Sequence, residues 1–132
     1  MVYLLDSNIC IAWLKNHEAV IEKIIDAGEN KICLCAPVKA ELWYGACKSQ
    51  RLDKNKVSLE WLFSDFPNFP FDDDAAFHFG EIRAYLTKKG TPIGLFDMQI
   101  AAIALAHDLT VVTHNTREFE RVPNLKLEDW LL

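Results

Sequence analysis

Acidic and amide side chains follow short apolar segments, or open the helices after them, in four places. They are Asp6, Glu41, Asp97 and the pair Asn115 and Glu118. If the apolar segments are parallel strands, their carboxyl ends meet at one crevice, where such sheets bind ligands. Carboxylates gathered there repel one another, so their natural partner is a hard divalent cation, Mg²⁺ or, as a substitute, Mn²⁺. Because such a cation activates water and neutralises charge on a phosphate, the pattern predicts phosphodiester hydrolysis.

Two of these acids lie on helical faces that must turn toward the sheet. Glu41 shares a predicted face with Val38 and Gly45, and Asp97 shares one with Ala101. A carboxylate turned inward costs several kcal/mol unless a partner or a metal compensates its charge. Neither segment has a basic residue at helical spacing from its acid, which favours a metal as the partner.

Structural roles compete with this interpretation at each position. Asp6 could cap a helix, and Asp97 could be a first-turn acid favoured by the helix dipole. Glu41 lies too deep in its helix for either role. Glu118 falls in a predicted loop, where a solvated surface acid is the ordinary explanation, and Asn115 suits an Asx turn. Their joint occurrence favours a shared site.

Three neighbouring side chains are candidates for orienting water, ligands or substrate. The hydroxyls of Ser7 and Thr113 stand next to the predicted acids in the sequence, and His114 follows directly. No serine or cysteine nucleophile motif and no phosphate-binding Gly-rich loop occurs in the chain. The proposed chemistry therefore depends on the acids.

The charge balance limits how the chain can bind nucleic acid. Its formal net charge is -5, which opposes nonspecific attraction to phosphates. Binding would need a local basic patch, and the densest basic run comprises Lys48, Arg51, Lys54 and Lys56. This run is either a solvated helix face or a phosphate-contacting surface.

The apolar periodicity predicts strands alternating with helices. We expect strands at 2–5, 31–35, 110–113 and 125–127. We expect helices from Ser7 or Asn8 to Lys15, at 18–27, from Pro37 through Gly45, and at 56–66, 74–89 and 95–107. Short apolar strands separated by helices indicate an α/β fold with a mainly parallel sheet covered on both faces. No linker divides the chain, so we expect one domain over residues 1–132.

Two further features concern the environment of the protein. The longest charge-free apolar stretch, Ile100–Ala106, is far shorter than the roughly 20 residues that span a membrane. No signal peptide is recognisable, so we expect a cytoplasmic protein without membrane contact. The four cysteines lack paired C-x-x-C spacing, and we expect them to be buried thiols.

Four segments of the chain resemble a known family. They are Tyr3–Asn8, Ala40–Leu42 with Gly45, Ile93–Asp97 running into Ile100–Ala102, and Val112–Phe119. In this order and spacing they are similar to PIN-domain proteins, and specifically to the VapC toxins of bacterial toxin-antitoxin pairs. The resemblance spans nearly the whole chain.

The resemblance implies a three-layer α/β/α sandwich and a Mg²⁺-dependent endoribonuclease. Its metal ligands would be Asp6 and Asp97, with Glu41 in the same acidic pocket. It also implies a homodimer, and inhibition by a cognate VapB antitoxin whose C-terminal tail reaches the active site. Members close in sequence are associated with cleavage of initiator tRNA in the anticodon region, and we extend that substrate here as an expectation.

The sequence departs from the family pattern at two positions. Ser7 stands where the family more often has Thr, which keeps the hydroxyl. Many relatives have Asp where Asn115 falls, so either Asn115 or Glu118 would complete the site around Asp6 and Asp97. Asn can ligate a metal through its carbonyl oxygen but adds no charge, so we expect weak metal binding.

Two other classes of function compete with the nuclease. An aspartate-dependent phosphatase would need Asp at position 8, where Asn8 stands. A receiver-like phospho-acceptor domain would need Lys at the position of His114. A noncatalytic or DNA-directed PIN module acting through partner binding would fit the negative net charge and the incomplete fourth acidic position.

Overall fold

A five-stranded, all-parallel sheet lies at the centre of the computed structural model, which describes residues 1–132. Its strands are β1 (Tyr3–Leu5), β2 (Ile32–Cys35), β3 (Asn68–Phe69), β4 (Thr110–Val112) and β5 (Lys126–Glu128), in the order β3-β2-β1-β4-β5. Tyr3 pairs with Ile32 on one side and Thr110 on the other, which makes β1 the central strand. All five strands therefore end at the same edge.

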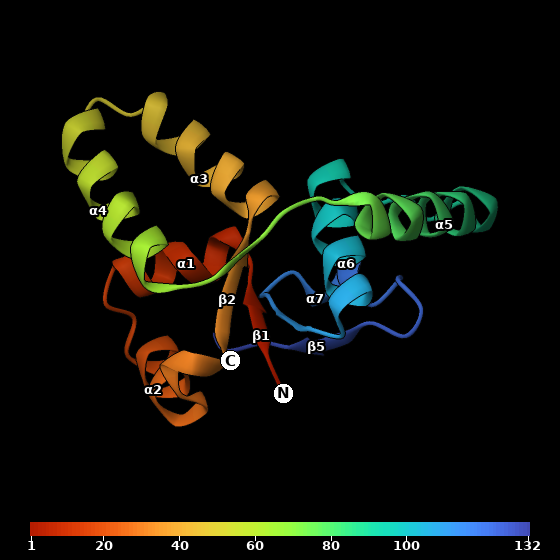
Figure 1. The fold of residues 1–132 in the computed structure, drawn as a ribbon, viewed down its shortest axis with the longest axis horizontal. Coiled ribbons are helices and arrows are strands. Elements are labelled where there is room, and N and C mark those ends of the chain that lie inside the picture. Colours follow the sequence, from red (N-terminus) through yellow and green to blue (C-terminus); the bar gives the residue numbers. More distant parts are fainter.

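Helices cover both faces of this sheet. They are α1 (Ser7–Leu14), α2 (Glu18–Ala27), α3 (Ala36–Cys47), α4 (Leu52–Asp65), α5 (Asp73–Lys89), α6 (Leu95–His107) and α7 (Thr116–Phe119), with a 3-10 turn, η1, at Glu29–Lys31. Figure 1 shows α1 to α4 on one side of the strands and α5 to α7 on the other. The predicted α/β architecture, with helices on both faces, is confirmed.

Burial explains why the central strands are almost entirely apolar. Leu4 and Leu5 point to opposite faces of β1, and neither is exposed to solvent. The same holds for the buried residues of β2, since a sheet covered on both faces has no solvent side. Helix α6 is buried from Ile100 to Ala104, which fixes the orientation of its first turn.

Three elements differ from the sequence-based expectations. Strand β3 was not expected, because its two residues are too short for any periodic pattern. Helix α4 begins at Leu52 rather than at residue 56, because its first turn is charged and exposed and so carries no apolar stripe. Residues 116–119 form the helix α7 instead of a loop, and this single turn is anchored in the core by its own last residue, the fully buried Phe119.

One expectation about the cysteines is wrong. Cys10, Cys33 and Cys35 are buried free thiols, as predicted, but Cys47 is exposed at the end of α3. Burial raises the pKa of Cys33 and Cys35 to about 12, which makes both thiols unreactive. None of the helices combines the length and the apolar character needed to cross a lipid bilayer.

Candidate active site

Asp6 follows the central strand and is 95% buried, with a relative exposure of only 5%. Its Oδ1 accepts a hydrogen bond from the Ile9 backbone N–H at 3.0 Å, so it caps α1. Its Oδ2 accepts one from the Thr113 hydroxyl. Burial raises the pKa of Asp6 while these hydrogen bonds lower it, with a net rise. The capping role is real, but it leaves the carboxylate at the sheet edge.

Thr113 connects the ends of two neighbouring strands. It follows β4, is fully buried, and donates its hydroxyl hydrogen to Asp6. The same oxygen accepts a hydrogen bond from the Asn115 backbone N–H at 2.9 Å. Thr113 therefore fixes the Asp6 carboxylate and the beginning of α7 together.

Asn115 links the acids of α6 and α7. Its Nδ2 donates to Oδ2 of Asp97 at 3.2 Å and to Oε2 of Glu118 at 3.0 Å. Glu118 is therefore not simply a solvated loop acid, because α7 turns it toward Asp97. In this arrangement Asn115 offers its amide hydrogens, and its carbonyl oxygen could face a cation only after the amide rotates.

Asp97 is the third residue of α6, whose N-cap is Gly94. Burial and the neighbouring Glu118, Glu41 and Asp6 raise its pKa to about 7. Glu118 has a lowered pKa, chiefly through hydrogen bonding with Asp97 and Asn115. In the absence of a nearby positive charge, the Asp97–Glu118 pair therefore keeps a proton to a higher pH than a free carboxylic acid would.

Glu41 approaches the other acids of the site from α3, on the other side of β1. It is half-buried, and the Ser7 hydroxyl donates to its Oε1 at 3.4 Å. Burial raises its pKa, and the charge on Asp6 adds to the rise. Ser7 thus orients Glu41 as Thr113 orients Asp6.

The donor set fits a hard cation, although the side chains do not close around one point. The site offers only oxygen ligands, and no lysine or arginine forms an ion pair with any of its acids. No three carboxylate, histidine or cysteine side chains are close enough to share a metal directly. Mg²⁺ usually takes one or two carboxylates and keeps several waters, so a loosely arranged set suits it.

His114 forms its hydrogen bond with Asp129 rather than with Asp6, Glu41, Asp97 or Glu118. Its Nδ1 lies 2.9 Å from Oδ2 of Asp129, and its side chain is 58% exposed. Asp129 is held by the Leu131 backbone N–H, and its charge contributes to the raised pKa of Asp6. Sequence reasoning missed Asp129, although the rule that selected Asp6, an acid directly after a strand, also applies to the end of β5.

The stability of the metal-free protein should fall as the pH rises from about 4 to about 7. Folded Asp97 keeps its proton up to about pH 7, whereas the unfolded side chain loses it near its ordinary value of 3.8. Because Asp97 is only partly buried, we expect a loss of about 1–2 kcal/mol after solvent screening. Urea unfolding at pH 5 and pH 8 in chelator measures it, and Asp97→Asn should remove most of the difference. An equal pH dependence in both proteins would contradict the assignment.

Comparison with known proteins agrees with this fold. A family model for the PIN domain matches residues 3–125. The tRNA(fMet)-specific endonuclease VapC of Shigella flexneri is 42% identical over 128 residues, 97% of each chain. The structure of VapBC2 from Rickettsia felis bound to a promoter DNA fragment matches with a TM-score of 0.93 at 36% identity, covering 98% of this chain and 99% of that one. DNA-bound VapBC from Salmonella typhimurium matches with a TM-score of 0.93 at 40% identity and 98% coverage of both chains.

The parallel sheet with acids at its carboxyl edge is that of a PIN domain. Within that class the chain belongs to the VapC family, the ribonuclease toxins of VapBC toxin-antitoxin systems. The resemblance expected from the four sequence segments is confirmed, as is the assignment to an enzyme class.

Proposed function

We propose that this ribonuclease is Mg²⁺-dependent and arrests translation by cutting initiator tRNA, with Asp6, Glu41, Asp97 and Glu118 as its catalytic acids. The observation that carries the proposal is the convergence of these four carboxylates, without a basic ion-pair partner, at one edge of the sheet. The substrate is supported by the tRNA(fMet) specificity of the Shigella flexneri and Salmonella typhimurium relatives.

The proposed roles follow from how each side chain is held. Asp6 and Asp97 would hold Mg²⁺, with Asn115 or Glu118 completing the ligands. When bound, Mg²⁺ supplies an activated water and positive charge for the scissile phosphate. Glu41, whose pKa is raised by burial, either joins the ligands or accepts a proton from the attacking water.

Cleavage of purified tRNA should depend on which tRNA is supplied and on a divalent metal ion. We expect cutting in the anticodon region with Mg²⁺ or Mn²⁺, and loss of cutting in excess chelator that added Mg²⁺ reverses. Elongator methionine tRNA is the matched control for the substrate, and gel analysis of both RNAs measures the ratio. Equal cleavage of the two tRNAs would refute the substrate, and full activity in chelator would refute the metal.

We further propose a homodimer controlled by a cognate VapB-type antitoxin. The antitoxin is supported by the Rickettsia felis and Salmonella typhimurium relatives, which are VapBC complexes bound to DNA, and the homodimer follows from the family resemblance. Since this chain carries a formal net charge of -5, DNA contact in such a complex would come from the antitoxin. Expression of the chain should arrest growth, and co-expression of its antitoxin should restore it. Growth arrest by a variant that cannot cut RNA would favour the noncatalytic alternative.

A further inference from the structure

A groove of about 1090 Å³ runs from the acids between α1, α3 and α4. Ser7 and Glu41 line one part of it, so the groove is continuous with the candidate active site. Apolar side chains form part of its lining, among them Ile11, Leu42 and Leu59. Any chain lying in this groove would therefore pass beside Glu41.

The charged side chains along the groove are mostly positive. Lys15, Lys48 and Lys54 line it, and Glu41 is its only acidic residue. This local excess of cations stands out in a protein whose formal net charge is -5. The groove therefore attracts a polyanion close to the acids, where the rest of the molecule repels one.

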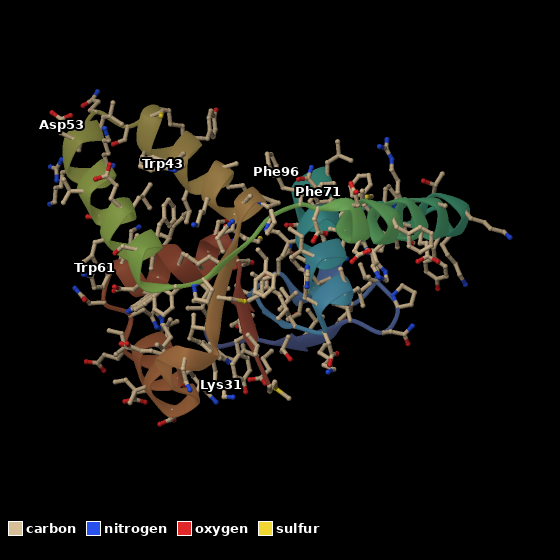
Figure 2. All side chains as sticks on the ribbon, in the orientation of Figure 1. Lys31, Trp43, Asp53, Trp61, Phe71 and Phe96 are labelled. Atoms are coloured by element: carbon tan, nitrogen blue, oxygen red, sulfur yellow. The ribbon has the colours of Figure 1, made fainter.

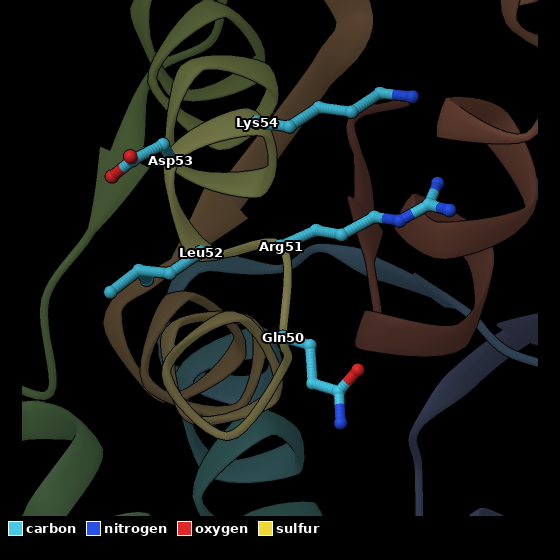
Figure 3. A pocket seen from close by; sticks show the side chains of 5 residues that line it. All are labelled: Gln50, Arg51, Leu52, Asp53 and Lys54. Carbon is cyan, nitrogen blue, oxygen red and sulfur yellow. The ribbon is translucent and has the colours of Figure 1, made fainter.

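The basic run around the α3–α4 turn divides into two groups in the structure. Lys48 and Lys54 line the groove, whereas Arg51 lines a second pocket with Lys54, where Figure 3 shows the two side chains extending in the same direction, away from Asp53. Lys56, by contrast, does not line the groove and lies 4.0 Å from Glu60 in an exposed ion pair. The sequence pattern grouped these four cations as one basic run, but only Lys48 and Lys54 line the groove.

Phe96 is an exposed aromatic ring that takes part in no aromatic pair. It is 47% exposed, lines the groove, and contacts neither another aromatic ring nor a cation. Figure 2 shows it at the start of α6, close to the N-terminal end of α3. Asp97 follows it directly in the same helical turn. A ring kept in solvent beside a catalytic acid has an available face for stacking.

We propose that the groove holds the single-stranded RNA next to the cleaved phosphodiester, with a base stacked on Phe96 and phosphates contacting Lys48 and Lys54. The inference rests on the proposed function and deepens it by naming the substrate track. Unpaired bases stack on exposed aromatic rings while cations follow the backbone, which is the combination found here. A protein segment would also suit the apolar lining, but the positive rim and the opening onto the acids favour RNA.

Binding should depend on the aromatic character of Phe96 and not only on its size. The probe is a short fluorescent single-stranded RNA of mixed sequence, titrated by anisotropy into protein carrying Asp97→Asn to prevent cutting. Adding Phe96→Leu should weaken binding about 5- to 150-fold, the effect of losing one stacked base. Phe96→Tyr should restore binding to within about twofold. Equal binding by the Leu variant would overturn the proposal.

A matched pair of lysine variants tests the path of the phosphates. Each phosphate contact adds about 0.7 to the slope of log affinity against log salt for single strands. Lys54→Ala should reduce the slope by about that amount, and Lys56→Ala, from the same helix, should leave it unchanged. Equal slopes for the two variants would contradict the proposed track.

The same variants separate this inference from the proposed function. If the wild-type protein cuts no RNA, the proposed function fails, while the binding comparison still tests the groove. If Phe96→Leu cuts and binds RNA as the wild type does, the groove proposal fails and the nuclease stands. Normal RNA binding with lost affinity for the cognate antitoxin would assign the groove to a protein partner and overturn the proposal.

Discussion

Replacing Asp97 or Asp6 by Asn will lower the rate of RNA cleavage by about 10³-fold or more while the protein stays folded. Each substitution removes one negative charge from the proposed metal site and keeps the shape of the side chain. A metal contributes several kcal/mol of transition-state stabilisation, and each 1.4 kcal/mol changes the rate tenfold. Single-turnover cleavage of initiator tRNA at saturating protein measures the effect without a contribution from substrate affinity.

The local structure explains why both variants should fold. Asn is as good a helix cap as Asp, so the Asp6→Asn amide oxygen can still accept from Ile9, and Thr113 can reverse its hydroxyl to accept. Asp97→Asn puts a neutral amide of the same shape in place of a carboxyl group whose pKa is already raised to about 7. The matched control is Asp74→Asn, another first-turn helix acid, exposed and outside the site. Cleavage within tenfold of wild type by both site variants would contradict the catalytic assignment.

Phe119→Ala will destabilise the protein by about 3–5 kcal/mol, the usual effect of emptying a fully buried phenylalanine site. Phe119 is fully buried and is the last residue of α7, whose single turn also carries Glu118. A helix this short is stable only through tertiary packing. We therefore expect the variant to lose cleavage as well, because Glu118 and Asn115 would no longer be held against Asp97.

Chemical denaturation measures this loss, and Phe77→Ala is the control. Phe77 is 65% exposed on α5, so its removal should change stability by no more than about 0.5 kcal/mol. Unfolding of Phe119→Ala at the same denaturant concentration as the control would contradict the role of Phe119 in holding α7. A Phe119→Ala protein that lost stability but cut RNA at the wild-type rate, while replacement of Glu118 abolished cutting, would also contradict this role.

The sequence predicted the elements that have a strong apolar pattern. Strands β1, β2 and β4 and helices α5 and α6 follow from periodicity, and the positions of Asp6 and Asp97 follow from the rule that parallel strands share an edge. The turn at α7 could not be predicted this way, because four residues contain no period. It forms through the tertiary burial of Phe119, and that burial brings Glu118 from an expected loop into contact with Asn115.

Hydrogen bonding at the site was also beyond the sequence. The pattern identified Ser7 and Thr113 as hydroxyl donors near the acids, but which acid each one contacts depends on the packing of α1 and α3 around β1. Similarly, Asn115 was expected to offer an oxygen to a metal, whereas its amide hydrogens face Asp97 and Glu118. Side-chain direction in a turn depends on local backbone geometry that residue spacing does not encode.

Direct binding of Mn²⁺ tests the central claim, that these acids jointly hold a divalent cation. Electron paramagnetic resonance of free Mn²⁺ during a titration gives the affinity and the number of sites without RNA. We predict saturable binding to the wild-type protein that Mg²⁺ displaces, lost in Asp6→Asn and Asp97→Asn and retained in Asp74→Asn. Unchanged Mn²⁺ binding in both site variants, or RNA cleavage by a wild-type protein that binds no Mn²⁺, would contradict the account.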